Sequence, residues 1–267
     1  FLIICSVFFL FKTYLSPTNN SMAEWAINYS GGFGRRGFLG EILTYLSIFL
    51  DQPYRKVILI FLFVILILYY LLIYFFIINI RLNHWIIFAI LSPLFLIFPI
   101  AELEALGRKD LLIPLFFVLF IYFSEKLSFS LSVLILILMY SILLLTHEVS
   151  MFYLPFFYFV LLTKYEEFNL SKILAIIFIS FFFLLIIYLL SNSIHTEDKF
   201  NLMCRNLEEK LNETCGLGAY MLKRTLSDNF NEMKGFNAGH ILHNFIIFLL
   251  GFSFLILLIL HSQFQKK

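Results

Sequence analysis

The residues that could do chemistry gather in three short segments of an otherwise apolar chain. The first is MAEWAINYSGGFGRRGFLGEIL, residues 22–43, in which Arg35 and Arg36 stand among five glycines. Glycine lets the backbone approach a ligand closely, and arginine offers a planar fork of donors that suits phosphate or pyrophosphate. Backbone N–H groups at the start of the following helix would add to such an anion site. The segment is a predicted phosphate-binding loop, and a flexible loop whose arginines reach lipid phosphates is the alternative.

The second segment is AELEALGRKD, residues 101–110, where Arg108 and Lys109 add two cations. Asp110 follows them at a predicted helix start, where the helix dipole favours a carboxylate. Glu102 and Glu104 would point to nearly opposite sides of a helix, which argues against a catalytic pair. This density of charge in so apolar a protein favours a binding role over an ordinary loop.

The third segment is THEVSMFYLP, in which His147 and Glu148 separate two apolar runs with almost no polar linker. Ionisable groups at membrane depth are costly and usually functional. Glu148 is therefore a candidate general base, and His147 a candidate proton carrier or phosphate ligand. Glu24 and Glu41 in the first segment are further candidates for the base. A solvated turn at the membrane surface is the alternative for the third segment.

The spacing of the cysteines and histidines favours a disulfide over a metal site. Cys204 and Cys215 share a long polar loop, and the pair predicts a disulfide in an oxidising compartment, with two free thiols as the alternative. His240 and His243 would share one helical face, but no third ligand accompanies them, so lipid headgroups are the better partner. We expect no metal and no other cofactor.

The elements that must position these segments are membrane-spanning helices. Of the 267 residues, 61% are apolar and only 13% are charged, and the mean hydropathy is +0.94. Soluble domains carry about 25% charged residues, so this composition excludes a soluble globular domain. A net charge of +2 gives no reason to expect a nucleic-acid-binding protein. The expected fold is an all-α integral membrane protein, one polytopic domain over residues 1–267 with about eight spans. The predicted spans are the rest of a first helix in 1–11, then 57–80, 84–100, 111–124, 128–146, 149–163, 172–191 and 238–261.

Residues 37–50 decide how the loops are distributed between the two faces. This stretch is short and contains Glu41, which favours an interfacial helix over a span. Residues 14–56, 101–110, 147–148 and 192–237 then lie on one face, and the three charged segments can meet. Basic residues are equally frequent on both faces and leave the side undecided, whereas the predicted disulfide favours the periplasm. Residues 216–230 are predicted to form an amphipathic helix on that face.

The first segment also carries a resemblance. The string W-x-x-N-Y-S-G-G-F-x-R-R-G-x-x-G-E is matched by Trp25, Asn28, Tyr29, Ser30, Gly31, Gly32, Phe33, Arg35, Arg36, Gly37, Gly40 and Glu41. It resembles polytopic inner-membrane proteins of bacterial O-antigen and capsule gene clusters, and the later GRKD and HE elements are similar in order. Such proteins are taken to be repeat-unit polymerases of the Wzy kind or relatives of the GT-C glycosyltransferases. The resemblance implies a polymerase-like or GT-C-like fold, a polyprenyl-linked glycan as substrate, and polysaccharide-assembly proteins as partners. GT-C enzymes usually bear an acidic residue in the first outer loop, where Glu24 or Glu41 could stand.

The residues and the resemblance together predict glycosyl transfer or polymerisation from a polyprenyl-diphosphate-linked sugar. Arg35, Arg36, Arg108 and Lys109 would stabilise the leaving pyrophosphate, and a carboxylate would deprotonate the acceptor hydroxyl. A transporter or flippase of lipid-linked oligosaccharide is the main alternative and would need polar residues inside several spans. A non-catalytic membrane subunit is the other.

Overall fold

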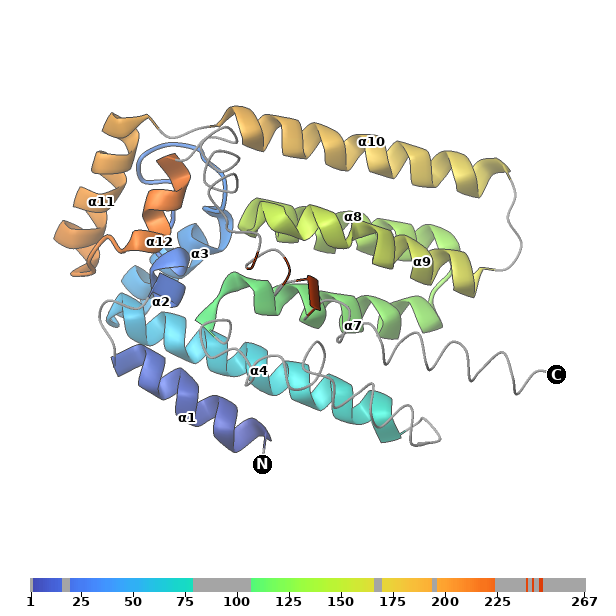
Figure 1. The fold of residues 1–267 in the computed structure, drawn as a ribbon, viewed down its shortest axis with the longest axis horizontal. Helices are drawn as coiled ribbons and strands as arrows, with labels where there is room; N and C mark the ends of the chain where they lie inside the picture. Colours follow the sequence, from blue (N-terminus) through green and yellow to red (C-terminus); the bar gives the residue numbers. More distant parts are fainter. Residues whose placement is uncertain are drawn as a thin grey trace.

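The computed structural model describes residues 2–15, 20–78, 107–165, 170–193 and 196–223, together with 239, 242, 245 and 246. Every regular element in these ranges is helical (Figure 1). In chain order they are α1 (Leu2–Leu15), α2 (Asn20–Trp25), α3 (Phe38–Leu50), α4 (Tyr54–Ile78), the 3₁₀ turn η2 (Lys109–Leu111), α7 (Leu112–Lys126), α8 (Phe129–Thr146), the 3₁₀ helix η3 (Glu148–Tyr153), α9 (Leu154–Lys164), α10 (Leu170–Asn192), α11 (Glu197–Leu211), α12 (Leu217–Tyr220) and η4 (Met221–Lys223).

Three helices are long and apolar enough to cross a bilayer: α4 over Tyr54–Phe75, α8 over Phe129–Thr146, and α10 over Leu170–Ser191. They correspond to the predicted spans 57–80, 128–146 and 172–191. For the described residues, the all-helical class and the presence of apolar helices long enough to span a membrane are thus confirmed. The predicted total of eight is not, because residues 84–100 and nearly all of 238–261 lie outside the described residues.

The predicted spans 111–124 and 149–163 become shorter helices. α7 has 15 residues, and α9 has only 11 because residues 148–153 form the 3₁₀ helix η3 instead. Pro155 lies in the first turn of α9, where its missing N–H costs no helical hydrogen bond. At 1.5 Å per residue α9 is roughly 16 Å long, about half the hydrocarbon core of a bilayer.

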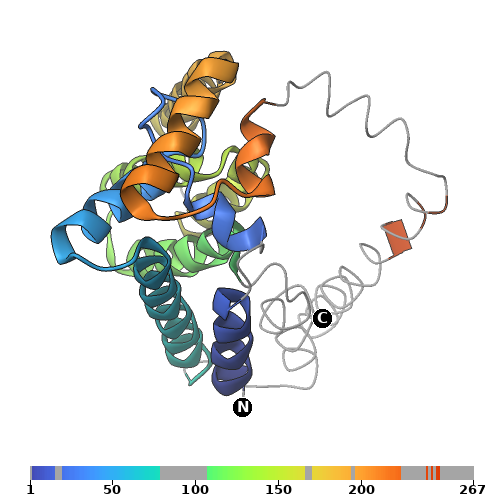
Figure 2. The same ribbon diagram turned by 90° about the vertical axis from the view of Figure 1, so that its left-hand side faces the viewer.

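The long helices pack as a bundle, and short helices cover one of its ends. α1 packs on α4, α4 on α7, α7 on α8 and α8 on α10, while α2, α3, α11 and α12 lie at the end where α4 begins and α8 finishes (Figure 1). Figure 2 looks at that end and shows α3, α11 and α12 in front of the bundle. The outward faces of α8, α9 and α10 are apolar, as expected of helices that face lipid. Hydroxyl pairs such as Tyr158 with Ser180, 2.8 Å apart, satisfy polar groups between helices.

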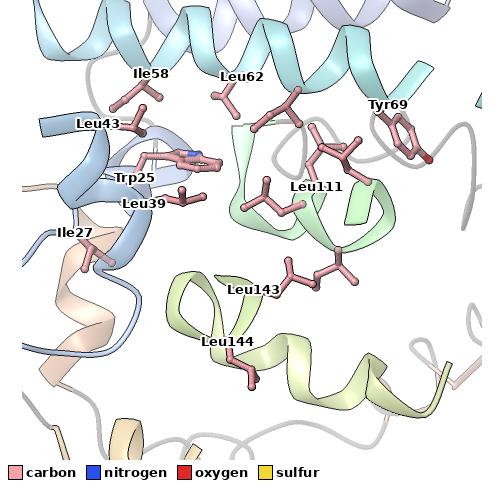
Figure 3. Close-up of a cluster of buried hydrophobic side chains, with 14 of the residues drawn as sticks. Trp25, Ile27, Leu39, Leu43, Ile58, Leu62, Tyr69, Leu111, Leu143 and Leu144 are labelled. Atoms are coloured by element: carbon pink, nitrogen blue, oxygen red, sulfur yellow. The ribbon is translucent and has the colours of Figure 1, made fainter. Parts of the chain in front are cut away.

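α3 covers the end of the bundle without spanning it. It has 13 residues, so it is about 20 Å long against a hydrocarbon core of about 30 Å. Leu39 and Leu43 face inward beside Trp25, with Ile58 of α4 opposite them (Figure 3). The outer face is apolar, and Phe49 is 84% exposed. These features suit the interfacial helix expected for residues 37–50.

Gly40 allows α3 to lie this close to the chain before it. A Cβ atom at Gly40 would fall 1.9 Å from the carbonyl oxygen of Ile27 and 2.6 Å from that of Trp25. Both neighbours are backbone atoms that cannot rotate away. Glycine is therefore required at this position by packing, and α3 fixes the loop that carries the arginines.

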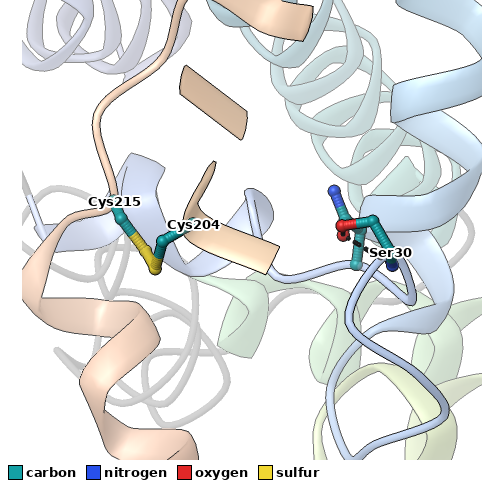
Figure 4. Close-up of a disulfide and its surroundings, with 4 residues drawn as sticks. Ser30, Cys204 and Cys215 are labelled. Carbon is teal, nitrogen blue, oxygen red and sulfur yellow. Dashed lines mark hydrogen bonds between the residues drawn. A yellow bond between two sulfur atoms is a disulfide. The ribbon is translucent and has the colours of Figure 1, made fainter. Parts of the chain in front are cut away.

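The predicted disulfide between Cys204 and Cys215 is present and ties the middle of α11 to the segment before α12 (Figure 4). α11 packs on the glycine loop, because a Cβ at Gly31 would lie 2.1 Å from the carbonyl oxygen of Lys199. The amide of Asn206 also donates to the carbonyl oxygen of Ser30. The predicted amphipathic helix over 216–230 is described only in part, as α12 and η4.

Candidate active site at the end of the bundle

The three charged segments meet at the covered end of the bundle. The loop before α3 supplies two arginines, η2 and the residues beside it supply a second group, and the junction of α8 and η3 supplies the third. α2 adds a carboxylate next to them. We call this group the charged cluster, and its members are Glu24, Arg35, Arg36, Arg108, Lys109, Asp110, His147 and Glu148.

Arg36 and Glu148 form the central ion pair of the charged cluster. Nε of Arg36 donates to both carboxylate oxygens of Glu148 at 2.8 Å, and Nη2 lies 2.8 Å from Oε1. Nη1 of Arg35 lies 3.8 Å from the same Oε1. Burial raises the pKa of Glu148, but the hydrogen bonds and charge of Arg36 outweigh it and hold the pKa below its usual value. Glu148 is therefore an ionised carboxylate in this arrangement and a weak base.

Lys109 holds the backbone beneath that ion pair. Arg36 has a left-handed φ of 65°, which is uncommon for a residue with a side chain. Nζ of Lys109 donates to the carbonyl oxygen of Arg36 at 2.6 Å and lies 5.8 Å from the ring centroid of Trp25. The Lys109 side chain is fully buried, and burial lowers its pKa to about 7 despite the nearby carboxylate of Glu24. The structure thus gives Lys109 a backbone contact, and its contact with pyrophosphate stays a prediction.

Asp110 and His147 form a dyad beside the arginines. Oδ1 of Asp110 lies 2.7 Å from Nε2 of His147, and Oδ2 lies 2.9 Å from Nε of Arg108. Burial raises the pKa of Asp110, but the His147 hydrogen bond and the charges of His147, Arg108 and Arg36 outweigh it and leave the pKa lowered. An ionised Asp110 accepts a hydrogen bond from the N–H of Nε2, and in that neutral tautomer the lone pair of the ring is on Nδ1.

Nδ1 of His147 is buried and has no hydrogen-bond partner among the described residues. His147 itself is only 2% exposed and follows the last residue of α8. An unpaired buried acceptor is rare in proteins and marks a place where a water or ligand proton can bind. Among the described residues, His147 thus keeps an unoccupied acceptor atom, whereas both carboxylate oxygens of Glu148 are bound to Arg36.

The other two candidates for the general base, Glu24 and Glu41, differ in their surroundings. Oε2 of Glu41 accepts the backbone N–H of Tyr29 at 2.8 Å, so Glu41 supports the glycine loop. Glu24 belongs to the charged cluster, with Oε1 3.9 Å from Nε of Arg108. Its Oε2 is buried without a hydrogen-bond partner in the described part of the chain. Glu41 thus has a structural contact, and Glu24 remains a candidate.

Two positioning residues escape prediction from the sequence. The indole N–H of Trp25 donates to the carbonyl oxygen of Gly107 at 2.6 Å and joins the first segment to the second. The hydroxyl of Tyr54 donates to the carbonyl oxygen of Trp25 at 2.8 Å. Trp25 belongs to the motif of the first segment, but no sequence pattern indicates its partner 82 residues away.

Access to the charged cluster is from the polar end of the molecule. The side chain of Arg108 is 39% exposed, that of Glu148 20%, and those of Arg35 and Arg36 15% each. A separate small hollow beside α2 and α4 shares no residue with the cluster and is lined by Met22, Ala23, Ala26, Tyr54, Arg55, Ile58, Glu213 and Thr214. Among the residues that the structure describes, no three His, Cys, Asp or Glu side chains could hold a metal ion. Glu102, Glu104, His240 and His243 lie outside them.

Comparison with protein-family models, with curated proteins and with solved structures finds no match to this chain. What the protein does must therefore be inferred from the geometry of the charged cluster and from the apolar bundle beneath it.

Proposed function

We propose that this protein is a membrane-embedded glycosyltransferase or polysaccharide polymerase that uses a polyprenyl-diphosphate-linked sugar. The observation that carries the proposal is the charged cluster, in which three segments far apart in the sequence meet at one end of an apolar bundle. Buried, pre-oriented charges of this kind stabilise charge that develops during a reaction better than water does.

The proposed substrate matches each part of this end of the molecule. A polyprenyl tail is soluble in the bilayer that surrounds the apolar helices. A diphosphate needs cations with forked donors, which Arg35, Arg36 and Arg108 supply at the accessible edge of the cluster. The glycan needs the polar, water-exposed face formed by α11.

The proposed reaction is a displacement at the anomeric carbon of the donor sugar. An acceptor hydroxyl forms the new carbon–oxygen bond, and the bond between the anomeric carbon and the phosphate oxygen breaks. The leaving diphosphate keeps that electron pair and is stabilised by Arg36 and Arg108. The hydroxyl proton passes to Nδ1 of His147, and Asp110 stabilises the imidazolium through Nε2.

The transporter alternative has less support from the described spans. α4 beyond Lys56 and the whole of α8 contain no charged residue. A route for a charged headgroup through the bilayer would need polar groups at membrane depth. The charges are concentrated at the end of the bundle instead, which favours chemistry at the membrane surface.

We further propose that this end faces the periplasm and that the chain lies in a bacterial inner membrane. The Cys204–Cys215 disulfide supports this side, because disulfides persist in oxidising compartments. Other polysaccharide-assembly proteins would be partners, and the reaction as written needs no metal or organic cofactor.

Gel analysis of the lipopolysaccharide or capsule from a strain that lacks this gene tests the proposal. Loss of the ladder with one repeat unit retained identifies a polymerase. Loss of the whole repeat identifies a monosaccharide transferase. An unchanged ladder from the deletion strain would contradict both.

A further inference from the structure

The guanidinium of Arg36, which offers the donors best suited to a diphosphate, is already bound to a carboxylate. Both carboxylate oxygens of Glu148 accept hydrogen bonds from Arg36, and Arg35 approaches the same carboxylate. Two oxygens of one anion on one guanidinium is also the geometry with which arginine binds phosphate. Any diphosphate that reaches Arg36 must therefore compete with Glu148.

The two sides of this pair are anchored differently. Lys109 donates to the carbonyl oxygen of Arg36 and is fully buried, so the position of Arg36 is set by the protein interior. Glu148 is the first residue of the 3₁₀ helix η3, and 20% of its side chain is exposed. Because a single 3₁₀ helix has poorer hydrogen-bond geometry than an α-helix, Glu148 is the member of the pair with the weaker support.

We propose that Glu148 is a placeholder for the diphosphate: in the empty site its carboxylate neutralises Arg36, and substrate binding exchanges it for phosphate oxygens. The inference rests on the proposed function, because it names the ligand class that the function requires. The exchange keeps Arg36 paired in both states, which avoids an isolated buried charge. It also frees the Glu148 carboxylate only when the diphosphate has taken its place on Arg36.

Binding of inorganic pyrophosphate to the purified full-length protein in lipid nanodiscs, measured by calorimetry, tests the exchange. Glu148→Gln removes the competing charge with little change in shape. We expect pyrophosphate to bind about tenfold more tightly to this variant than to the wild type, since one charge-assisted hydrogen-bonded competitor is lost. Glu208→Gln, an exposed change on α11, is the matched control and should leave the affinity unchanged.

The opposite result follows if Glu148 only supports Arg36. Loss of the Glu148 charge would then disorder the guanidinium of Arg36. Pyrophosphate would bind the Glu148→Gln variant as tightly as the wild type, or less tightly. Either of these results overturns the exchange, as does the absence of pyrophosphate binding in both proteins.

A second measurement uses the wild type alone and does not depend on how the variant folds. Carbodiimide labelling of Glu148, read by peptide mass spectrometry and normalised to Glu208, should increase when pyrophosphate is added, because the carboxylate leaves Arg36. Protection of Glu148 by pyrophosphate would contradict the exchange.

These tests separate the exchange from the proposed function. Tighter pyrophosphate binding by Glu148→Gln without any glycosyl transfer would support the exchange and contradict the proposed function. Glycosyl transfer by the wild type, together with unchanged or weaker pyrophosphate binding by Glu148→Gln, would support the proposed function and contradict the exchange.

Discussion

Replacement of Lys109 by methionine gives the sharpest test of the interior of the charged cluster. Lys109→Met keeps the length of the side chain but removes the donor to the carbonyl oxygen of Arg36, 2.6 Å away. A buried carbonyl left unpaired costs about 1–3 kcal/mol of stability. The substitution also removes a group whose pKa falls from an ordinary 10.5 to about 7 on burial, and this makes its effect depend on pH.

The sign of the pH dependence follows from proton binding. Above the unfolded pKa of 10.5 Lys109 is neutral in both states, and its contribution to stability is fully present. As the pH falls toward 7 the unfolded chain binds a proton that the folded chain does not, so stability is lost at up to about 1.4 kcal/mol per pH unit. Between about pH 9 and pH 7 the wild type should therefore lose about 2–3 kcal/mol that Lys109→Met does not lose.

Reversible unfolding in detergent across this pH range measures the difference in the free energy of unfolding between the wild type and Lys109→Met. All other titrating groups are common to both proteins, so the slope of that difference reports Lys109. Lys210→Met, an exposed change on α11, is the control and should give a difference that does not vary with pH. A constant difference for Lys109→Met would refute the assignment of Lys109 as a buried lysine of lowered pKa.

Three further predictions concern separate parts of this end of the molecule. Arg36→Lys keeps the charge but loses the planar fork, so glycan synthesis should fall substantially at unchanged protein level, and Arg36→Ala should lower it further, by about ten- to a hundredfold; normal glycan from Arg36→Lys at wild-type expression would remove Arg36 from the site. Gly40→Ala places a methyl group 1.9 Å from a backbone oxygen and should lower the free energy of unfolding by about 1–3 kcal/mol; an unchanged denaturant midpoint would contradict this packing. Alkylation of the denatured, unreduced protein should modify only Cys5, whereas three modified cysteines would show that Cys204 and Cys215 are not paired.

The apolar runs were sufficient to predict the spanning helices that the structure describes. Residues 57–80, 128–146 and 172–191 correspond to α4, α8 and α10, because long uninterrupted apolar stretches allow little else. The apolar run 149–163 does not form one α-helix, because its first residues belong to the 3₁₀ helix η3 and α9 begins only at Leu154. The apolar composition of the run gives no sign of this change. Composition reports where a helix is favoured, but the exact residue at which it begins depends on local hydrogen bonding.

The meeting of the three charged segments was predictable, whereas the pairing within the charged cluster was not. The sequence places Arg36, Lys109 and His147 in three segments that one topology brings to the same face. It holds no signal that Lys109 contacts the Arg36 backbone rather than a ligand, because that contact depends on a left-handed φ at a residue other than glycine. Nor does it indicate that Asp110 would pair with His147, 37 residues later, since such contacts arise only from packing.

The proposed activity of the protein is the transfer of a glycosyl group from a polyprenyl diphosphate. The lipid-linked glycan that accumulates in a deletion strain can be extracted and incubated with the purified wild-type protein in nanodiscs. Mass spectrometry should then detect an extended glycan and one free polyprenyl diphosphate for each unit added, and much less of both with an Arg36→Ala variant. Recovery of the unchanged lipid-linked glycan after incubation with folded wild-type protein would contradict the claim.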